Sequence, residues 1–465
     1  MTVKALMPVR GLNLVVPLPH EGTAMRTTET AGHAQARPGA VSTLIGASLR
    51  PGDVDSTDRR STRATRAMPG TRTSATATRT TTTRATPAAS EPSADSSPFT
   101  FEDLVVAYLD CRRTKRNSAS ALAFESRLER NLCELHEQLL AGEYQPGRSI
   151  CFVVTRPKYR EVWAADFRDR VVHHLLYNRI SPRFHAGFVA SSCACIPGRG
   201  TLYAAQLLEH DVRAVTQNWS RPAHYLKCDL ANFFVAIDKH VLCAQLGRRV
   251  TEPWWMRLAE TILFHDPRLD VDVRSPRQLL QRVPAHKSLF NAPQDHGLPI
   301  GNLSSQFFAN VHLDALDQHA KHHVKARRYV RYVDDFVLLH ESTAWLTAAL
   351  ADIESWLPRV LGARLNPSKT ILQPVARGID FVGHVVKPWS RTTRRRTVNG
   401  AVHRIERMPA DDLFTVANSY FGLLRQATHS HADRARVANA LRYRGHSIKA
   451  DLTKTYRTTT EGPTT

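Results

Sequence analysis

Acidic residues are scarce in this sequence, and their shortage limits the classes of protein it can be. The 465 residues include 42 Asp and Glu against 63 Lys and Arg, which leaves a formal net charge of +21. A chain this basic suits a polyanionic partner and argues against an enzyme of small metabolites. No apolar run reaches 18 residues, so no membrane span is predicted. The composition also excludes a collagen, a coiled coil and a disulfide scaffold.

Cysteine is infrequent and shows no metal-binding spacing. The seven cysteines include no C-x-x-C pair, and a single residue separates Cys193 from Cys195. Reduced, buried thiols of a cytosolic protein are therefore the simplest interpretation. Histidine is abundant, at 22 residues, with adjacent pairs such as His322-His323. Because adjacent side chains on a helix point roughly 100° apart, we expect these pairs to be structural or to face nucleic acid rather than to share a metal.

Aromatic residues are absent from the first 97 positions. A segment without them cannot bury enough surface to offset the entropy of ordering, so residues 1–97 are predicted to be a disordered tail. The tail holds only twelve basic and seven acidic residues, so most of the net charge belongs to the remaining chain. Its Arg- and Thr-rich composition resembles that of an organellar transit peptide. We favour a solvated tail, or a start codon that was assigned too far upstream.

Ordered structure is expected from Phe99 onwards. Leucines at helical spacing predict an amphipathic helix over 118–141, followed by a strand over 150–154 and a second helix over 168–180. Residues 251–296 look like an insertion, and no chemistry is assigned to them.

An acidic pair within a hydrophobic stretch is the most informative feature. In Tyr329–Leu339, two β-prone runs flank Asp334 and Asp335, which is the pattern of a tight hairpin. Such a turn favours Asn-Gly or Asp-Gly, and two like charges at an apolar tip are unfavourable unless they serve a function. An isolated Asp-Asp would indicate an exposed acidic turn. The flanking strands favour a functional site, where a divalent cation would offset the repulsion.

A further acidic residue has the same setting. The short predicted strand Tyr225–Asp229 ends in Asp229, which can therefore meet Asp334 on a neighbouring hairpin. Nucleotidyl transfer uses two Mg²⁺ ions roughly 3.5–4 Å apart, and such hard cations bind carboxylate oxygens and substrate phosphates. Between these strands, the loop 297–302 leads into a predicted helix, and its glycines would let a base pair or a sugar approach the backbone.

These elements occur in the order and spacing of a reverse transcriptase. Tyr332–Asp335 resembles the YxDD box, Asp229 with Phe234 resembles the first palm motif, and Gly297–Gln306 resembles the motif between them. The likeness is to bacterial retroelement enzymes and extends over about residues 100–390. Its outer parts are the fingers segments around Lys158, Arg160 and 167–174, and the late palm motifs at 365–370 and 381–383.

The resemblance implies an RNA-directed DNA polymerase with an α+β, right-hand fold of fingers, a palm with a mainly antiparallel sheet, and a helical thumb. It places fingers and palm at 98–387 and a basic thumb at 388–465. The implied cofactor is a pair of Mg²⁺ ions, with Mn²⁺ as a substitute. The implied partners are an RNA template, a DNA or RNA primer, and dNTPs, without a membrane.

The resemblance also implies roles for individual residues. Phe234 is the expected steric gate against a ribose 2′-hydroxyl, and Lys369 is expected to protonate pyrophosphate or contact a phosphate, with a solvated salt bridge as the alternative. Catalytic and metal-binding roles fall on Asp229, Asp334 and Asp335. Binding of dNTP falls on Lys158, Arg160, Phe234, Ile300, Gly301 and Lys369. Nucleic-acid contacts are expected from Arg199, Arg391, Arg394, Arg395 and Arg396.

One position departs from most reverse transcriptases. These enzymes place Gln before the glycine of the middle motif, whereas this chain has Ile300. The form Ile300-Gly301 followed by Ser305-Gln306 resembles the enzymes of diversity-generating retroelements. This likeness implies low fidelity, a small basic accessory protein as a partner, and a bacterial cytoplasmic location. Two alternatives stay open: a reverse transcriptase of antiphage defence, and a maturase-like RNA-binding protein without polymerase activity.

Overall fold

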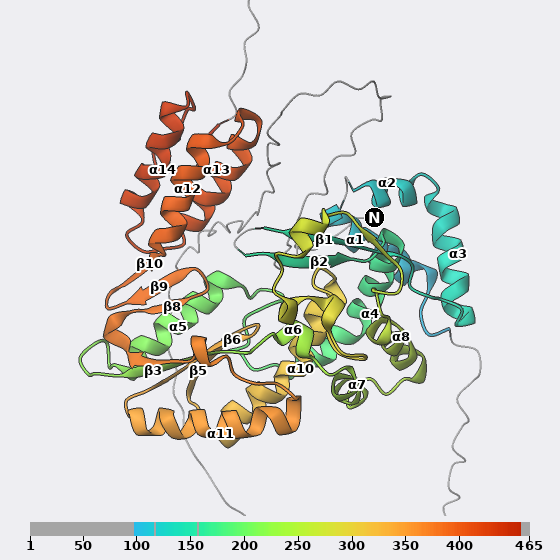
Figure 1. Cartoon of the computed structure of the whole chain (residues 1–465), viewed down its shortest axis with the longest axis horizontal. Coiled ribbons are helices and arrows are strands. Elements are labelled where there is room, and N and C mark those ends of the chain that lie inside the picture. The colour runs from blue at the N-terminus through green and yellow to red at the C-terminus, as the bar shows by residue number, and fades with distance from the viewer. Residues whose placement is uncertain (1–96, 116–117, 156–157, 457–465) are drawn as a thin grey trace, which may run out of the picture. The chain divides into compact units, whose positions relative to one another are not determined.

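The structure is a computed structural model that describes residues 97–115, 118–155 and 158–456 (Figure 1). The predicted disorder of residues 1–97 therefore falls, except for Ser97, outside the described residues. Within them, helices are combined with three small β-sheets, which agrees with the predicted mixture of α and β structure.

The predicted helix over 118–141 is wrong, because the structure divides it in two. Helix α1 (Phe101–Lys115) is followed by α2 (Ala119–Glu125) and α3 (Leu128–Ala141). The break lies at Arg127, whose φ of −136° and ψ of 46° leave the helical region. The side-chain amide of Asn131 donates to the carbonyl of Phe124 over 2.8 Å and so satisfies the end of α2.

The first sheet has the strand order β2-β1-β4. Strand β1 (Ser149–Val154) pairs antiparallel with β2 (Arg160–Ala164) and parallel with β4 (Val271–Val273). Because β4 belongs to the predicted insertion 251–296, that segment is not an independent module but completes this sheet. The rest of it forms short elements: α8 (Pro253–Phe264), α9 (Arg277–Leu280), η1 (Ala285–Lys287) and η2 (Leu289–Asn291).

The second sheet is antiparallel and has the order β5-β6-β3-β7. Its strands are β3 (His224–Asp229), β5 (Arg328–Tyr332), β6 (Asp335–His340) and β7 (Ile371–Pro374). The central strands β3 and β6 are mostly buried, whereas the edge strand β7 is largely exposed. Helix α5 (Thr201–Val215) packs on one face and α11 (Thr343–Leu361) on the other (Figure 1).

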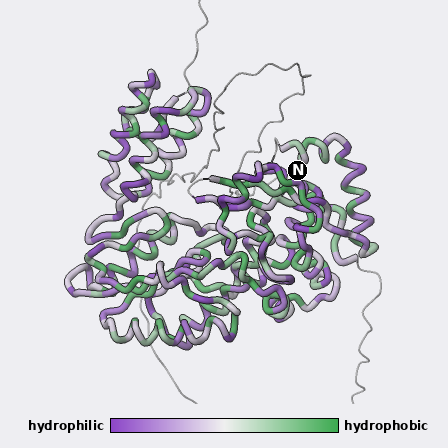
Figure 2. Tube along the Cα trace, viewed as in Figure 1, coloured by the Kyte–Doolittle hydropathy of each residue, from purple (hydrophilic) through white to green (hydrophobic). Residues whose placement is uncertain are grey.

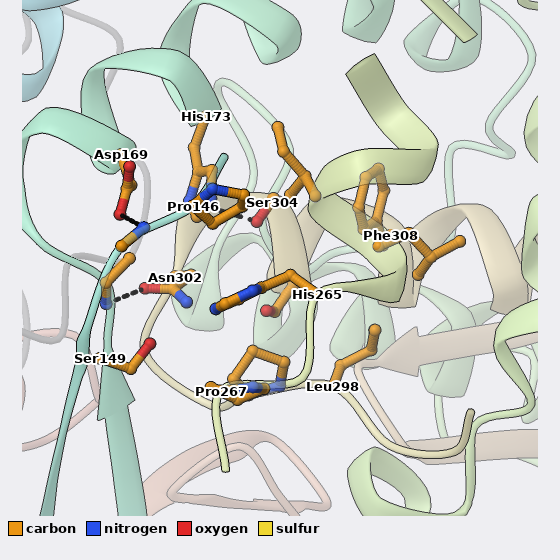
Figure 3. Close-up of a pocket in the computed structure, with 16 residues that line it drawn as sticks. Pro146, Ser149, Asp169, His173, His265, Pro267, Leu298, Asn302, Ser304 and Phe308 are labelled. Atoms are coloured by element: carbon orange, nitrogen blue, oxygen red, sulfur yellow. Dashed lines mark hydrogen bonds between the residues drawn. The ribbon is translucent and has the colours of Figure 1, made fainter. Parts of the chain in front are cut away.

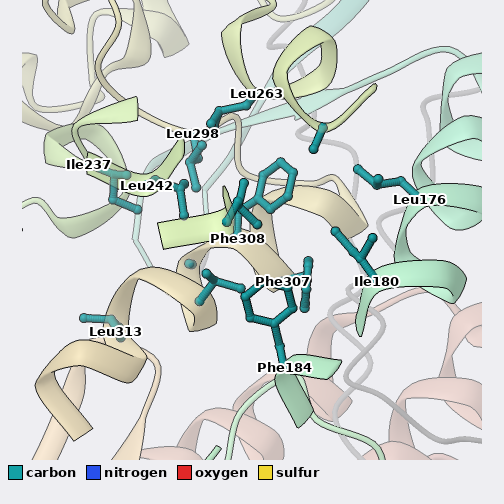
Figure 4. Packing of buried hydrophobic residues seen from close by; sticks show 14 of the residues in the cluster. Leu176, Ile180, Phe184, Ile237, Leu242, Leu263, Leu298, Phe307, Phe308 and Leu313 are labelled. Carbon is teal, nitrogen blue, oxygen red and sulfur yellow. The ribbon is translucent and has the colours of Figure 1, made fainter. Parts of the chain in front are cut away.

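Helix α10 (Leu303–Gln318) lies at the centre of the main hydrophobic core. Its Phe307 and Phe308 are almost fully buried and point into a cluster with side chains of α4 (Phe167–His185), α7 (Lys239–Gly247) and α8 (Figure 4). The loop before α10 is bonded to β2 of the first sheet, through the amide of Trp163 and the carbonyl of Ile300. Three short elements complete this region: α6 (Phe233–Ala236), the π-helical turn η3 (His319–His323) and η4 (Pro367–Lys369).

The C-terminal elements form a third sheet and a separate helical cluster. Strands β8 (Ile379–Phe381), β9 (His384–Lys387) and β10 (Ser390–Thr393) are antiparallel and follow the turn η5 (Val375–Arg377). Helices α12 (Arg395–Arg407), α13 (Ala410–Leu424) and α14 (His431–Tyr443) share their own hydrophobic core, as predicted for a helical C-terminal region.

Hydrophobic and hydrophilic residues are interspersed along the helices (Figure 2). Among the described residues, no helix has both the length and the hydrophobicity needed to cross a lipid bilayer.

Candidate active site

The predicted acidic hairpin is present, but its turn is shifted by one residue. Strand β5 ends at Tyr332, which pairs with Asp335 at the start of β6, so the two turn residues are Val333 and Asp334 rather than Asp334 and Asp335. Val333 has a φ of +53°, which is unfavourable for a β-branched residue. Such strain persists only where the surroundings impose it, and it is common at functional sites.

The sheet register brings the third carboxylate to this turn. Asp229, the last residue of β3, lies opposite Asp335 in the antiparallel pairing of β3 with β6. The amide of Leu230 donates to the carbonyl of Asp334 over 3.2 Å, so the chain after Asp229 also contacts the turn. Asp229 is buried, whereas Asp334 and Asp335 are half-buried. The structure therefore brings together all three predicted catalytic residues.

The three carboxylates repel one another in this setting. Burial, followed by the charges of Asp229 and Asp335, raises the pKa of Asp334 to about 6. Burial also raises the pKa of Asp335, while the ammonium group of Lys227, whose Nζ lies 3.9 Å from Asp335 Oδ1, opposes this increase. Partly buried carboxylates supply the oxygen donors that Mg²⁺ or Mn²⁺ takes in proteins. The residues therefore fit the predicted divalent-cation site.

Lys369 lies at this site as predicted for a dNTP-binding residue, but its contact is with a carboxylate. Its Nζ is 2.6 Å from Oδ1 of Asp229, and Asn366 donates its backbone amide to the carbonyl of Asp229 over 2.8 Å. The turn η4 thus fixes Asp229 from the side opposite to β6. This bridge is not the solvated salt bridge considered from the sequence, because Asp229 is buried, and the phosphate contact of Lys369 stays a prediction.

A group of cations lies close to the carboxylates. Lys158 and Arg160 are exposed, as residues that contact a triphosphate require, and Arg160 begins β2. They are joined by Lys287 at the end of η1. Burial lowers the pKa of Lys287, and the charges of Lys158, Lys369 and Arg160 lower it further, whereas Asp229 raises it. Lys287 therefore feels the charges of Lys158, Arg160 and Lys369 as well as that of Asp229.

Lys287 was missed from the sequence, because it belongs to the segment 251–296 to which no chemistry was assigned. No local pattern distinguishes it from a solvated lysine. Its position comes from the buried carboxylate of Glu161 on β2, which accepts hydrogen bonds from the Ser288 hydroxyl and, over 2.9 Å, from the Leu289 amide. This long-range contact fastens the end of η1 to β2.

The loop of the middle motif lies against β2, and this contact gives Gly301 a role that differs from the one predicted from the sequence. The amide of Trp163 donates to the carbonyl of Ile300 over 2.7 Å. Gly301 has a φ of +135°, and a Cβ at this position would lie 2.5 Å from the carbonyl oxygen of Trp163. The glycine thus admits the backbone of β2 into the space that the sequence predicts for a base pair or a sugar. Ile300 itself is half-buried.

Phe234 lies in α6, five residues after Asp229. Its half-buried ring meets Phe233 edge to face, with centroids 5.3 Å apart, and its carbonyl accepts a hydrogen bond of 2.8 Å from the amide of Leu298. The first palm motif and the loop before α10 are thereby connected. This position beside the acidic site is compatible with the predicted steric gate.

A buried ion pair supports the hairpin, and it was also missed. Arg331 on β5 is fully buried, and its guanidinium donates to both carboxylate oxygens of Asp317 on α10, over 2.7 and 2.6 Å. Further bonds reach Ser192 Oγ (2.8 Å), Asn310 Oδ1 (3.3 Å) and the carbonyl of Val333 (3.1 Å). The last contact holds the strained turn residue next to Asp334. An arginine between Val330 and Tyr332, in the middle of a predicted strand, was the signal available, because a buried charge requires a partner.

The structure corrects one predicted nucleic-acid contact, that of Arg391, and shows internal bonds for a second residue, Arg199. Arg391 on β10 is buried, with its guanidinium bonded to Glu209 on α5 over 2.5 Å and to the carbonyl of Gln426 over 2.6 Å. It joins the third sheet to its neighbours and is not accessible to a phosphate. Arg199 is half-buried and donates to the carbonyls of Val189 and Ser192, both over 2.7 Å. The guanidinium of Arg391 is therefore committed to structural bonds, whereas Arg199 uses only Nη1 for them and its contact with nucleic acid stays a prediction.

The other three arginines of this set lie around the start of α12. Arg394 is half-buried and forms an ion pair with Asp380 on β8. Arg395 and Arg396 are exposed on the first turn of α12. Of the predicted basic run, these last two remain the residues best placed to contact a nucleic-acid backbone.

A small pocket lies away from the carboxylates, between β1, α4 and α10 (Figure 3). It contains none of the predicted site residues. Asn302 accepts from the amide of Ala165 over 3.0 Å, and Asp169 accepts from the amide of Gly147 over 2.9 Å. Burial lowers the pKa of His173 to about 3, so this histidine is neutral and lies 3.4 Å from the Ser304 hydroxyl. These internal bonds fix the start of α10, and the pocket is a structural junction.

Comparison with known proteins agrees with the geometry. Residues 154–386, half of the chain, match the family model described as reverse transcriptase (RNA-dependent DNA polymerase). The matched region contains the three carboxylates and every residue predicted to bind dNTP. The chain therefore belongs to the reverse transcriptase family. The domain is that of an RNA-directed DNA polymerase, a nucleotidyltransferase.

Solved structures with a similar backbone trace include two telomerases from Candida species. The telomerase of Candida albicans, in complex with a TWJ fragment of telomeric RNA, has 12% sequence identity and a TM-score of 0.39, with 70% of this chain and 60% of that chain covered. The apo telomerase of Candida tropicalis, truncated from its C-terminal domain, has 12% identity and a TM-score of 0.38, with 56% and 59% covered. The chain thus spans less than two thirds of each. No curated protein matches the sequence.

Proposed function

We propose that this protein is a reverse transcriptase that synthesises DNA on an RNA template by two-metal-ion nucleotidyl transfer. The observation that carries the proposal is the sheet register, which places Asp229 opposite Asp335 and beside the strained turn of Asp334. The group of cations next to these carboxylates supports it, because a triphosphate would neutralise the cations, while the metal ions bound with it would neutralise the carboxylates.

In this mechanism Asp229 and Asp334 would hold two Mg²⁺ or Mn²⁺ ions, and Asp335 would complete the acidic cluster. When bound, the ions activate the primer 3′-hydroxyl and neutralise charge that develops on the triphosphate. Lys158, Arg160 and Lys287 bind phosphate oxygens and stabilise the leaving pyrophosphate electrostatically.

Lys369 has a separate task in the proposed reaction. Its ammonium group forms a salt bridge with Asp229, and in the reaction it would turn to the leaving pyrophosphate. It then donates a proton or a hydrogen bond to the leaving group. The ring of Phe234 occupies the space that a ribose 2′-hydroxyl would need, which selects dNTPs.

The proposed architecture is a right hand. Residues 98–387 would form the fingers, around β1 and β2, and the palm, around the β5-β6-β3-β7 sheet; residues 388–465 would form the thumb. The separate hydrophobic core of α12–α14 supports this division. Arg395 and Arg396, on the exposed first turn of α12, would contact the template–primer backbone.

We further propose that the enzyme belongs to a bacterial diversity-generating retroelement and acts in the cytoplasm with a small basic accessory protein. The support is Ile300 in the middle motif, where a polar side chain would otherwise reach the nucleotide. The absence of disulfides among the seven cysteines, all in the described residues, is consistent with a reducing compartment. The rival roles are antiphage defence and RNA binding without polymerisation.

Primer extension on a primed RNA template tests the polymerase proposal. The wild type should incorporate dNTPs in the presence of Mg²⁺, and Asp334→Asn should abolish incorporation. Asp411→Asn, which removes an exposed carboxylate on α13, is the matched control and should remain active. Full activity of Asp334→Asn, or no activity of the wild type, would refute the proposal.

The retroelement proposal needs a different measurement. Misincorporation is scored separately opposite each template base for the wild type and for Ile300→Gln. We expect frequent errors opposite adenine in the wild type and fewer in the variant. Uniformly high fidelity of the wild type contradicts this assignment while leaving the polymerase proposal intact.

A further inference from the structure

A second group of potential metal ligands lies outside the acidic site. It consists of His319 and His323 of the π-helical turn η3 and Asp352 of α11. One ligand atom from each residue lies within 4.8 Å of the other two. Nε2 of His319 is 2.5 Å from one carboxylate oxygen of Asp352, and Nε2 of His323 is 3.4 Å from the other. Both imidazoles therefore turn the same nitrogen towards one carboxylate.

The surroundings hold this group in a fixed orientation. The ring of His319 is stacked between the ring of His323, at a centroid distance of 4.7 Å, and the indole of Trp356, at 4.3 Å. Trp356 lies one helical turn after Asp352 on α11. The π-helical turn, in which the amide of Val324 donates to the carbonyl of His319 over 3.0 Å, places the two histidines over one another. Such turns are rare and frequently occur at functional sites.

The chemistry of this donor set differs from that of the acidic site. Two neutral imidazoles and one carboxylate are the ligands of many zinc sites, with a fourth position left for water. Mg²⁺ prefers oxygen ligands and is a poor match for imidazole. The side chain of His319 is 8% exposed, whereas that of His323 is 68% exposed, so one ligand is held in place and the other is open to an incoming ion.

We propose that His319, His323 and Asp352 form a binding site for Zn²⁺ or a similar transition-metal ion, separate from the Mg²⁺ site. The segment from His323 to Asp352 contains the whole β5–β6 hairpin with Asp334 and Asp335. A metal bound here would clip η3 to α11 and close a loop around that hairpin. Its role would be to stabilise the support of the acidic site without taking part in nucleotidyl transfer. The site does not depend on the polymerase proposal.

The experiment measures Zn²⁺ binding by the metal-stripped full chain in excess Mg²⁺, which occupies the carboxylate site. Calorimetry should detect a Zn²⁺ site in the wild type that is at least ~100-fold weaker in His323→Ala and in Asp352→Ala, since loss of an outer-shell partner alone costs about 10–100-fold. His322→Ala removes an exposed neighbouring histidine and should bind as the wild type does. Circular dichroism confirms that each variant is folded.

Two further readouts distinguish this site from other histidines and cysteines of the chain. Co²⁺ should give visible absorption bands with the wild type and His322→Ala that His323→Ala lacks. Zn²⁺ should also raise the melting temperature of the wild type but not that of His323→Ala. The proposal is overturned if the wild type binds no Zn²⁺, or if His323→Ala and Asp352→Ala bind it with unchanged affinity.

Discussion

The buried ion pair of Arg331 and Asp317 offers a sharp test of how the acidic hairpin is held. We predict that Arg331→Met both destabilises the protein and reduces polymerase activity, although Arg331 contacts neither substrate nor metal. Burial alone would lower the pKa of Arg331, but the Asp317 carboxylate outweighs this effect and the net pKa is raised. Both side chains are fully buried, so their charges depend on each other.

The magnitude follows from what the substitution leaves behind. Removal of the guanidinium leaves a buried carboxylate with the Tyr329 hydroxyl as its remaining donor, at 2.7 Å. Breaking a buried pair in this way costs about 3–5 kcal/mol. The carbonyl of Val333 also loses its 3.1 Å contact, which frees the strained turn. Because small displacements of reacting groups can cost about 100-fold in rate, we expect a loss of activity of this order.

The assay combines urea unfolding with primer extension at a temperature where the variant is folded. In the double variant Arg331→Met/Asp317→Asn the buried charge is gone, and an acceptor for Tyr329 is kept. It should therefore recover at least half of the lost stability but little of the activity. Arg327→Met, at an exposed position before β5, is the control and should change neither. A stability loss below about 1 kcal/mol for Arg331→Met, or unchanged activity, would refute the reasoning.

Three further predictions follow from the charges of the site. Because burial raises the pKa of Asp334 from 3.8 to about 6, its ionised form destabilises the metal-free folded state above pH 6 by up to about 3 kcal/mol. In EDTA, Asp334→Asn should thus be more stable than the wild type at pH 8. The difference in stability should shrink as the pH falls from 6 to 4. Thermal unfolding measures it, and a difference that does not change with pH would contradict the prediction. Lys287→Ala should raise the KM for dNTP about tenfold, since a charge-assisted hydrogen bond contributes about 1.5–3 kcal/mol. Steady-state kinetics measure this change, with His286→Ala at the exposed neighbouring position as the control. An unchanged KM argues against a phosphate contact of Lys287. Arg395→Ala and Arg396→Ala should each lower the salt dependence of template–primer binding by about one unit of slope. In the same titration Arg391→Met should leave the slope unchanged. A smaller slope for Arg391→Met than for Arg395→Ala and Arg396→Ala would instead support the phosphate contact of Arg391 that the sequence predicts.

Much of the candidate site was predictable because its signals are local. Short stretches of alternating or continuous hydrophobicity predict the strand that ends in Asp229. They also predict the apolar hairpin that carries Asp334 and Asp335. The positions of the helices α4 and α10 followed from the same kind of pattern. The exact turn did not, because Val333 takes a positive φ that its own side chain disfavours and that the contact with Arg331 helps to impose.

Errors arose where the function of a charge depends on a distant partner. Arg391 stands in a basic run and was expected to face nucleic acid, yet Glu209, 182 positions away in the chain, makes it a buried structural residue. Conversely, Lys287 has no local signal and reaches the acidic site because Glu161 anchors the following segment to β2. The histidines were judged as adjacent pairs, whereas His319 and His323 meet four residues apart across from Asp352.

The sequence by itself determined the family, the order of the motifs and the three acidic residues, because covalent spacing and hydrophobic pattern are properties of the chain. Only the tertiary structure decided which of the many basic residues are exposed, which are neutralised and which converge on the carboxylates. The physical reason is that the state of a charge is set by burial and by its nearest opposite charge, and these neighbours come from segments far apart in the sequence.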